Sequence, residues 1–183
     1  MSDRAGNPGS TSPTAGVRIL AIDPSLRCTG FAVLAQIDGR ISALEYGIIK
    51  NPPALLPSGC LVAIHEKVRD LIARHQPECA AFESVIYVQS LRTAITLGSA
   101  RGAALLAAAQ HGLPIHEYAP RRVKQSVVGR GGAQKDQVSF MVRALLGLTE
   151  TPTADAADAL AIGLTHFQTA GSARRGVATL ARI

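Results

Sequence analysis

Aromatic side chains are scarce in this chain of 183 residues, which has no tryptophan and only 4% aromatic residues in total. The hydrophobic content is nevertheless 47%, which is enough for a chain of this length to bury a proper core. Overall disorder is therefore excluded. We expect one domain whose core is built from closely packed Val, Ile, Leu and Ala side chains.

Cysteine is rare, and histidine shows no pattern that indicates a ligand set. The three cysteines, Cys28, Cys60 and Cys79, are odd in number and have no Cys-x-x-Cys spacing. The sequence therefore indicates neither a disulfide framework nor a zinc site, and a reducing cytosol fits. The five histidines, at positions 65, 75, 111, 116 and 166, are interpreted as structural or surface residues.

Long apolar runs are missing, and so is a basic-then-apolar signal pattern at the N-terminus. We therefore expect no membrane association and a soluble, cytoplasmic protein. Acidic residues are fewer than basic ones, with a net charge of +6 and a pI near 9.7. This excess of positive charge indicates a polyanionic partner. The indication is weak, because arginines 174, 175 and 182 near the C-terminus supply half of the net charge.

Short apolar runs alternate with helical patterns along the chain. We expect strands at 17–22, 30–36, 40–49, 79–82 and 115–118, and helices at 61–75, 91–110, 134–146 and from about 153 onward. The Asp38-Gly39 pair predicts a tight hairpin. This order predicts an α/β domain with a mixed five-stranded sheet flanked by helices, whose first strands form an antiparallel meander.

Both ends of the chain are expected to lie outside this domain. Residues 1–15 are mostly Gly, Ser, Thr, Pro and Asn, which cannot bury a core, so we predict a disordered lead. Residues 169–183 are predicted to be a flexible basic tail. The folded domain is therefore predicted to span residues 16–168.

Two apolar strands stop on acids, Asp23 and Glu83. Functional groups in α/β sheets gather at the carboxyl ends of strands, so we expect these two carboxylates to meet. Taken singly, each has a simpler explanation. Asp23 precedes a proline and opens a turn in that interpretation, and Glu83 sits in a solvated loop.

A second acidic pair begins the last helix. Thr153 is a suitable N-cap, and Asp155 and Asp158 lie three residues apart, on one helix face, among small alanines. The alternative is that Asp155 only complements the helix dipole and that Asp158 is a solvated surface residue.

Four converging carboxylates would repel one another, so the set makes sense only with compensating cations. An all-oxygen site without Cys or His ligands suits Mg²⁺ or Mn²⁺. Such a site inside a basic protein predicts metal-assisted phosphodiester hydrolysis, in the two-ion form with one ion for the attacking water and one for the leaving oxygen.

The motifs of this chain resemble those of the RuvC family of Holliday-junction resolvases, in order and spacing, over about residues 18–168. The resemblance is carried by Ile22-Asp23-Pro24-Ser25 with Thr29-Gly30, Phe82-Glu83, Leu97-Gly98-x-Ala100-Arg101-Gly102, Val123-Lys124-Gln125-x-Val127-Val128-Gly129 and Ala154-Asp155-Ala156-Ala157-Asp158-Ala159-Leu160-Ala161.

The resemblance implies a ribonuclease-H-like fold, a homodimer, and Mg²⁺-dependent paired nicking of four-way DNA junctions in recombination and repair. The cut ends would be ligatable, with 5′-phosphate and 3′-hydroxyl groups. By position, Asp23, Glu83, Asp155 and Asp158 match the family's catalytic, metal-binding carboxylates. Kinship also implies a RuvA-RuvB branch-migration complex as partner.

Basic residues near these motifs are expected to contact DNA. Lys124 and Lys135 match basic residues that the family uses near the scissile phosphate and the junction, the alternative being solvated lysines. Lys135 also opens a helix, where free backbone N–H groups favour a phosphate. Arg130 lies in a glycine-rich loop, residues 129–132, interpreted as flexible backbone facing DNA rather than as a nucleotide P-loop.

The helix at 91–110 carries a smooth face of Gly and Ala residues, at positions 98, 100, 102, 103, 104 and 107. It either packs on the sheet or meets its twin across a dimer axis. A two-fold axis would place two active sites on symmetric strands of one junction.

Other interpretations of the acidic set remain open. An apolar strand ending in Ile-Asp-Pro also resembles the phosphate-loop strand of the actin and sugar-kinase ATPases, but those need two such domains. A nuclease of the same fold acting on RNA or ordinary duplex is a second alternative. A catalytically silent junction-binding module is a third.

One departure from the family pattern generates a prediction. Members commonly carry a stacking aromatic three positions after the glutamate, where this chain has Ile86, followed by Tyr87. Stacking on a base is worth roughly 1–3 kcal/mol, so we hypothesise that Tyr87 takes over that role. Tyr87→Ala should then weaken both junction cleavage and unstacking of crossover bases; unchanged values of both would contradict the hypothesis.

Overall fold

The computed structural model describes residues 16–85 and 90–174. Residues 1–15, 86–89 and 175–183 lie outside the description, and with them the predicted N-terminal lead, Ile86 and Tyr87. In chain order the elements are β1 (Val17–Asp23), β2 (Cys28–Ile37), β3 (Arg40–Lys50), α1 (Pro57–His75), β4 (Cys79–Glu83), α2 (Leu91–Gln110), β5 (Ile115–Tyr118), α3 (Pro120–Val128), α4 (Lys135–Leu146) and α5 (Ala154–Arg174).

The strands form one mixed sheet in the order β3-β2-β1-β4-β5. The first three strands are an antiparallel meander, and β4 and β5 are parallel to β1 and to each other. The hairpin between β2 and β3 turns at Asp38 and Gly39, whose φ angles of 50° and 80° are those of a tight two-residue turn. The predicted mixed sheet and its meander are thus confirmed.

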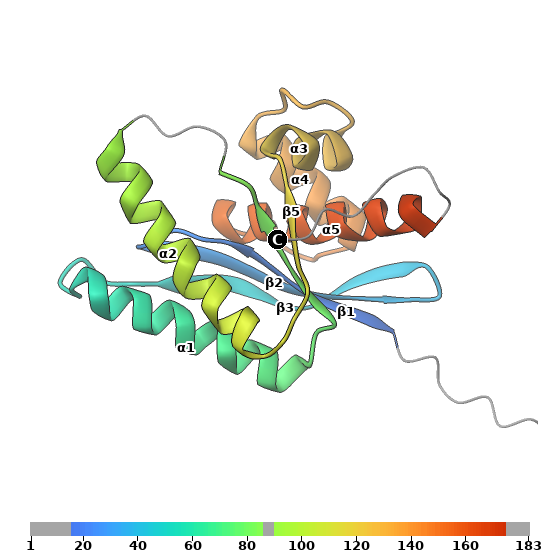
Figure 1. Cartoon of the computed structure of the whole chain (residues 1–183). Coiled ribbons are helices and arrows are strands. Elements are labelled where there is room, and N and C mark those ends of the chain that lie inside the picture. The colour runs from blue at the N-terminus through green and yellow to red at the C-terminus, as the bar shows by residue number, and fades with distance from the viewer. Residues whose placement is uncertain (1–15, 86–89, 175–183) are drawn as a thin grey trace, which may run out of the picture.

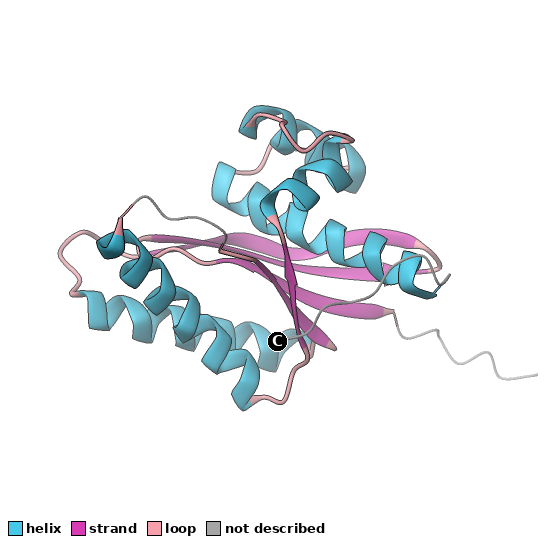
Figure 2. Cartoon of the chain, turned by 45° about the horizontal axis from the view of Figure 1, so that its top comes forward, coloured by secondary structure: helices cyan, strands magenta, loops and turns pink. Residues whose placement is uncertain are grey.

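Helices cover both faces of the sheet (Figures 1 and 2). Alternate residues of β1 show why, because Ile19 and Ala21 belong to the core beneath α5, whereas Leu20 and Ile22 belong to the core beneath α1 and α2. Because β1 is buried on both faces, almost all of its residues are apolar, as its sequence shows. α3 and α4 pack on the α5 side.

The long helix α2 divides its small residues between two environments. Ala100, Ala104 and Ala107 are fully buried in the core that α2 shares with α1. Positions 98 and 102 differ, because a side chain added at Gly98 or Gly102 would meet nothing within 4 Å. Packing inside the protein therefore explains the alanines, and the glycines lie on a face that this chain leaves open.

Two helices differ from expectation. The basic segment 120–128, to which we assigned no helix, forms α3, with Pro120 in its first turn and Val123 and Val127 buried. α5 continues to Arg174, beyond the predicted end of the domain at 168, and Thr169 within that extension is 6% exposed. The expected tail is therefore helical through 174. Within the described residues, no helix combines the length and the apolar character needed to span a bilayer.

A prediction follows from the close approach of α5 to β2. A Cβ built on Gly30 would lie 2.0 Å from the backbone oxygen of Asp155, and backbone cannot yield as a side chain does. Gly30→Ala should therefore lower the free energy of unfolding by about 1–3 kcal/mol, measured by urea denaturation.

The matched control is Gly98→Ala, because Gly98 lies within α2 with open space around it. Alanine there should leave stability unchanged or raise it by up to about 1 kcal/mol. Equal stabilities of the wild type and Gly30→Ala would show that α5 does not press on β2 as described.

Candidate active site

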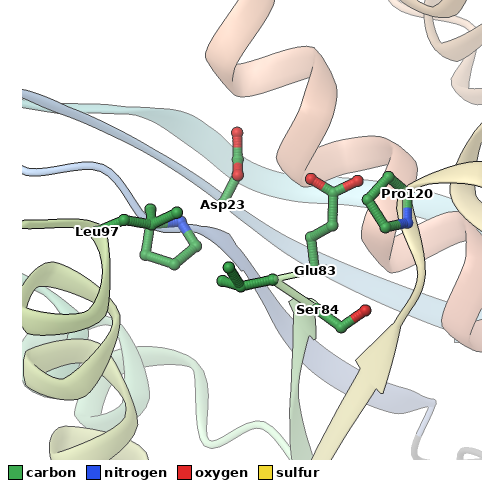
Figure 3. A pocket seen from close by; sticks show the side chains of 7 residues that line it. Asp23, Glu83, Ser84, Leu97 and Pro120 are labelled. Atoms are coloured by element: carbon green, nitrogen blue, oxygen red, sulfur yellow. The ribbon is translucent and has the colours of Figure 1, made fainter. Parts of the chain in front are cut away.

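Two strand ends place the first two acids side by side. Asp23 is the last residue of β1 and Glu83 the last of β4, and these strands are parallel neighbours in register at Ile22 and Phe82. Both acids line a pocket of about 320 Å³, with Ser84 and Pro120 among its other walls. Figure 3 shows both carboxylates reaching into the same space.

The start of α5 supplies the second pair. The first backbone bond of the helix runs from the N–H of Ala157 to the carbonyl of Thr153, which places Thr153 at the predicted N-cap position. Asp155 and Asp158 are half-buried, and both raise the pKa of the Asp23 carboxyl. The structure therefore brings the four predicted acids to one place, which the solvated-surface alternative does not explain.

The electrostatics of the group are unfavourable without a cation. Burial, followed by the charges of Glu83, Asp158 and Asp155, raises the pKa of Asp23 to about 7. The pKa of Glu83 is also raised, first by burial and then by Asp158. Desolvation and like charges both penalise ionised carboxylates, so the site stabilises positive charge placed among them.

Both predicted lysines lie at this site. The Lys135 ammonium lies 3.2 Å from the Asp158 carboxylate, whose charge raises the pKa of the lysine. Lys124, on α3, is close enough to lower the pKa of Glu83. Arg130 is exposed in the segment between α3 and α4. The lysines thus border the acids, and Arg130 lies on the outer surface.

Sequence reasoning missed the contacts of two side chains near the acids, Cys28 and Arg101. The Cys28 thiol donates a hydrogen bond to Asp155 at 2.9 Å, and this bond is the main reason that the pKa of Cys28 is raised to about 11. Arg101, to which we had assigned no role, pairs with Glu117 and lies over the ring of Phe82, 5.8 Å from its centroid. Cys28 belongs to no motif, and the motif that contains Arg101 gave no sign of its contacts, which come from residues distant in sequence.

The residues present fit a hard divalent cation. The four carboxylates offer only oxygen donors, the kind that Mg²⁺ and Mn²⁺ prefer, although among the described residues no three of them have oxygens within 4.8 Å of one another. The raised pKa of Asp23 provides an independent reason, because a bound cation would remove the repulsion that causes it. The Lys135 ammonium already supplies one positive charge beside Asp158.

A pH prediction follows from the Asp23 carboxyl. Its pKa is higher in the folded than in the unfolded chain, so the folded protein retains this proton to higher pH. Its contribution to stability is present below about pH 4 and is lost as pH rises through about 7. In EDTA, Asp23→Asn should therefore be more stable than the wild type at pH 8, by up to about 4 kcal/mol, and lose that advantage near pH 4.

Urea denaturation at a series of pH values measures the effect. Asp70→Asn, at an exposed position on α1, is the control and should leave the wild-type pH curve unchanged. If the free energies of unfolding of Asp23→Asn and of the wild type change with pH in the same way, then neither burial nor the neighbouring acids raise the pKa of Asp23.

Comparison with known proteins identifies the family. The family model described as crossover junction endodeoxyribonuclease RuvC matches residues 19–166. A relative of that name from Akkermansia muciniphila is 57% identical over 151 residues, covering 82% of this chain and 90% of the relative. Another from Cronobacter sakazakii is 47% identical over 148 residues, covering 81% and 85%.

Solved structures give the same result. The chain superposes on T. thermophilus RuvC in complex with Holliday junction substrate with a TM-score of 0.80 and 35% identity, covering 90% of this chain and 99% of that one. The yeast mitochondrial resolvase Ydc2, at 11% identity and a TM-score of 0.64, shares the fold. The predicted ribonuclease-H-like fold is therefore confirmed, and the chain belongs to the crossover junction endodeoxyribonuclease RuvC family.

Proposed function

We propose that this protein is a structure-selective endonuclease that resolves four-way Holliday junctions in homologous recombination and DNA repair. The observation that carries the proposal is the pocket that Asp23 and Glu83 line, close enough to Asp155 and Asp158 for their charges to raise the pKa of Asp23, in a chain of this family. The junction bound to the T. thermophilus relative supports the substrate class.

The four carboxylates are the proposed metal ligands, for two Mg²⁺ ions per active site, with Mn²⁺ able to substitute. When bound, the ions supply Lewis-acid stabilisation of the phosphate and lower the pKa of the attacking water. The protein's own contribution is to position the four carboxylates. The ends of β1 and β4 and the first turn of α5 hold the acids before substrate arrives, so little reorganisation is needed.

The lysines are proposed to hold the DNA. Lys124 and Lys135 border the carboxylates, where their charge compensates that of the scissile phosphate and its neighbours. Lys135 is the first residue of α4, so the helix N-terminus adds unpaired N–H groups beside it. Arg130, being exposed, is proposed to contact backbone phosphates farther from the cut.

Symmetric cutting requires two sites, so we propose a homodimer. The face where α1 and α2 meet carries a groove whose walls include Val62, Gly102 and Leu106. Val62 and Leu106 are 55% and 53% exposed, an apolar surface that a second copy would cover. Two active sites related by a two-fold axis would nick symmetric strands of one junction, and the products would carry ligatable 5′-phosphate and 3′-hydroxyl ends.

The cellular setting is proposed from kinship. A RuvA-RuvB branch-migration complex would present the junction, in the cytoplasm and on the nucleoid. The nuclease domain is proposed to begin at residue 16, with its end moved from 168 to at least Arg174, where α5 ends.

Cleavage and binding assays on matched variants test the function. Asp23→Asn and Glu83→Gln should each reduce Mg²⁺-dependent cutting of a mobile four-way junction by about a hundredfold or more. Junction affinity should stay at or above that of the wild type, because the lysines that hold DNA are unchanged and a repelling charge is lost. Gel-based cleavage and fluorescence anisotropy measure the two quantities.

Glu78→Gln is the matched control, since Glu78 is exposed and immediately precedes β4, at the opposite end from Glu83. It should cut like the wild type. Loss of binding in step with cutting would contradict the proposed division of labour between acids and lysines. Equal cutting of linear duplex or of an RNA–DNA hybrid would instead favour a nuclease of the same fold without junction selectivity.

A further inference from the structure

A second group of potential metal ligands lies away from the carboxylates. Cys79, the first residue of β4, and His116, on β5, point toward α5, which contributes His166. All three residues are buried, with exposures of 7%, 3% and 5%. Glu83 lies four residues farther along β4, which places the two groups roughly 13 Å apart along the strand. The cluster is therefore separate from the acidic site.

The ligand atoms have the spacing of a transition-metal site. One sulfur and one nitrogen from each ring lie within 4.8 Å of one another, and among the residues that the structure describes no other such group of three is found. The Cys79 sulfur is 3.5 Å from His166 Nε2. A tetrahedral zinc ion with bonds of about 2.3 Å to sulfur and 2.0 Å to nitrogen holds those two atoms about 3.5 Å apart.

The surroundings orient the His166 ring for this purpose. The Tyr118 hydroxyl is 2.8 Å from Nδ1, so that nitrogen is satisfied within the protein while Nε2 is directed at the sulfur. A metal-binding imidazole commonly donates its other N–H in this way, which fixes the tautomer.

Space remains for a fourth ligand. A cavity of about 460 Å³ opens beside the cluster, and its walls include all three residues together with Glu78 and Phe167. Glu78 is exposed and adjacent in sequence to Cys79. Either its carboxylate or a water molecule from this cavity would complete a tetrahedral set.

We propose that Cys79, His116 and His166 form a binding site for a borderline-soft divalent cation, Zn²⁺ first and Co²⁺ as its spectroscopic substitute. One thiolate and two imidazoles suit such ions and do not suit Mg²⁺. The ion would join β4, β5 and α5, three elements that the chain connects only through long intervening segments. On binding, the Cys79 thiol releases its proton to solvent and the sulfur bonds the metal.

Cobalt titration of the full-length, untagged protein tests this site directly. A thiolate bound to Co²⁺ gives a near-ultraviolet charge-transfer band, whereas Co²⁺ on carboxylates alone gives none. With Mg²⁺ in excess to occupy the carboxylates, the band should saturate at about one Co²⁺ per chain and disappear when Zn²⁺ is added. Zinc should also raise the melting temperature by about 5 °C or more.

Cysteine variants locate the ion. Cys79→Ser should abolish the charge-transfer band and reduce the zinc-dependent rise in melting temperature, the remainder coming from zinc on the carboxylates. Cys60→Ser is the matched control, because Cys60 is also buried and hydrogen bonds to the Leu55 carbonyl, and it should retain both. Each variant's own metal-free melting temperature is its reference, so a destabilised fold does not hide the result.

His116→Gln keeps the thiol and provides a second test. It should weaken Co²⁺ binding at least about tenfold while leaving junction cutting in Mg²⁺ intact. The proposal is overturned if the wild type shows no band. It is equally overturned if the band survives Cys79→Ser, or if it depends on Cys28, which lies beside Asp155 in the acidic site. Because cutting in Mg²⁺ is measured separately, failure of this proposal leaves the proposed nuclease function untouched.

Discussion

The structure depends on bringing four negative charges together at one edge of a sheet against their mutual repulsion. Parallel pairing of β1 and β4 places Asp23 beside Glu83, and the close passage of α5 over Gly30 adds Asp155 and Asp158. The passage of α5 over β2 leaves no room for a side chain at Gly30, because the Asp155 backbone lies against it. The cost is visible in the raised pKa values of Asp23 and Glu83. Positive charge placed among these carboxylates relieves that repulsion.

The rest of the fold can be understood as support for that edge. α5 is buried against the sheet on one face, and its alanines and Gly163 allow it to lie close to Leu34 and Ala21. On the other face, α1 and α2 bury the opposite side of the same strands and leave an apolar groove outward. α3 and α4 bring Lys124 and Lys135 to the acids from above the α5 layer. The acids and the two lysines therefore share one edge of the sheet, and the apolar groove lies on the opposite face.

Most of the fold followed from local patterns, and the misses have identifiable causes. The Asp38-Gly39 turn was predictable because few residues accept positive φ, and both strand-end acids were predictable because apolar runs stop at them. α3 was missed because its apolar face is only Val123 and Val127, too few to show a period. The extension of α5 to Arg174 was missed because its last residues are small and polar and owe their helicity to packing.

The sequence by itself determined the order of the strands and of the longer helices, the candidate acids and the family, since these depend on periodicity and on motifs within short segments. Only the tertiary structure decided which distant side chains meet. Cys28 at Asp155, and Cys79 with His116 and His166, come from separate elements with no motif spacing between them. Hydrogen bonding and metal coordination act over a few ångströms in space, and nothing in linear spacing encodes a distance that only the packing of α5 on the sheet creates.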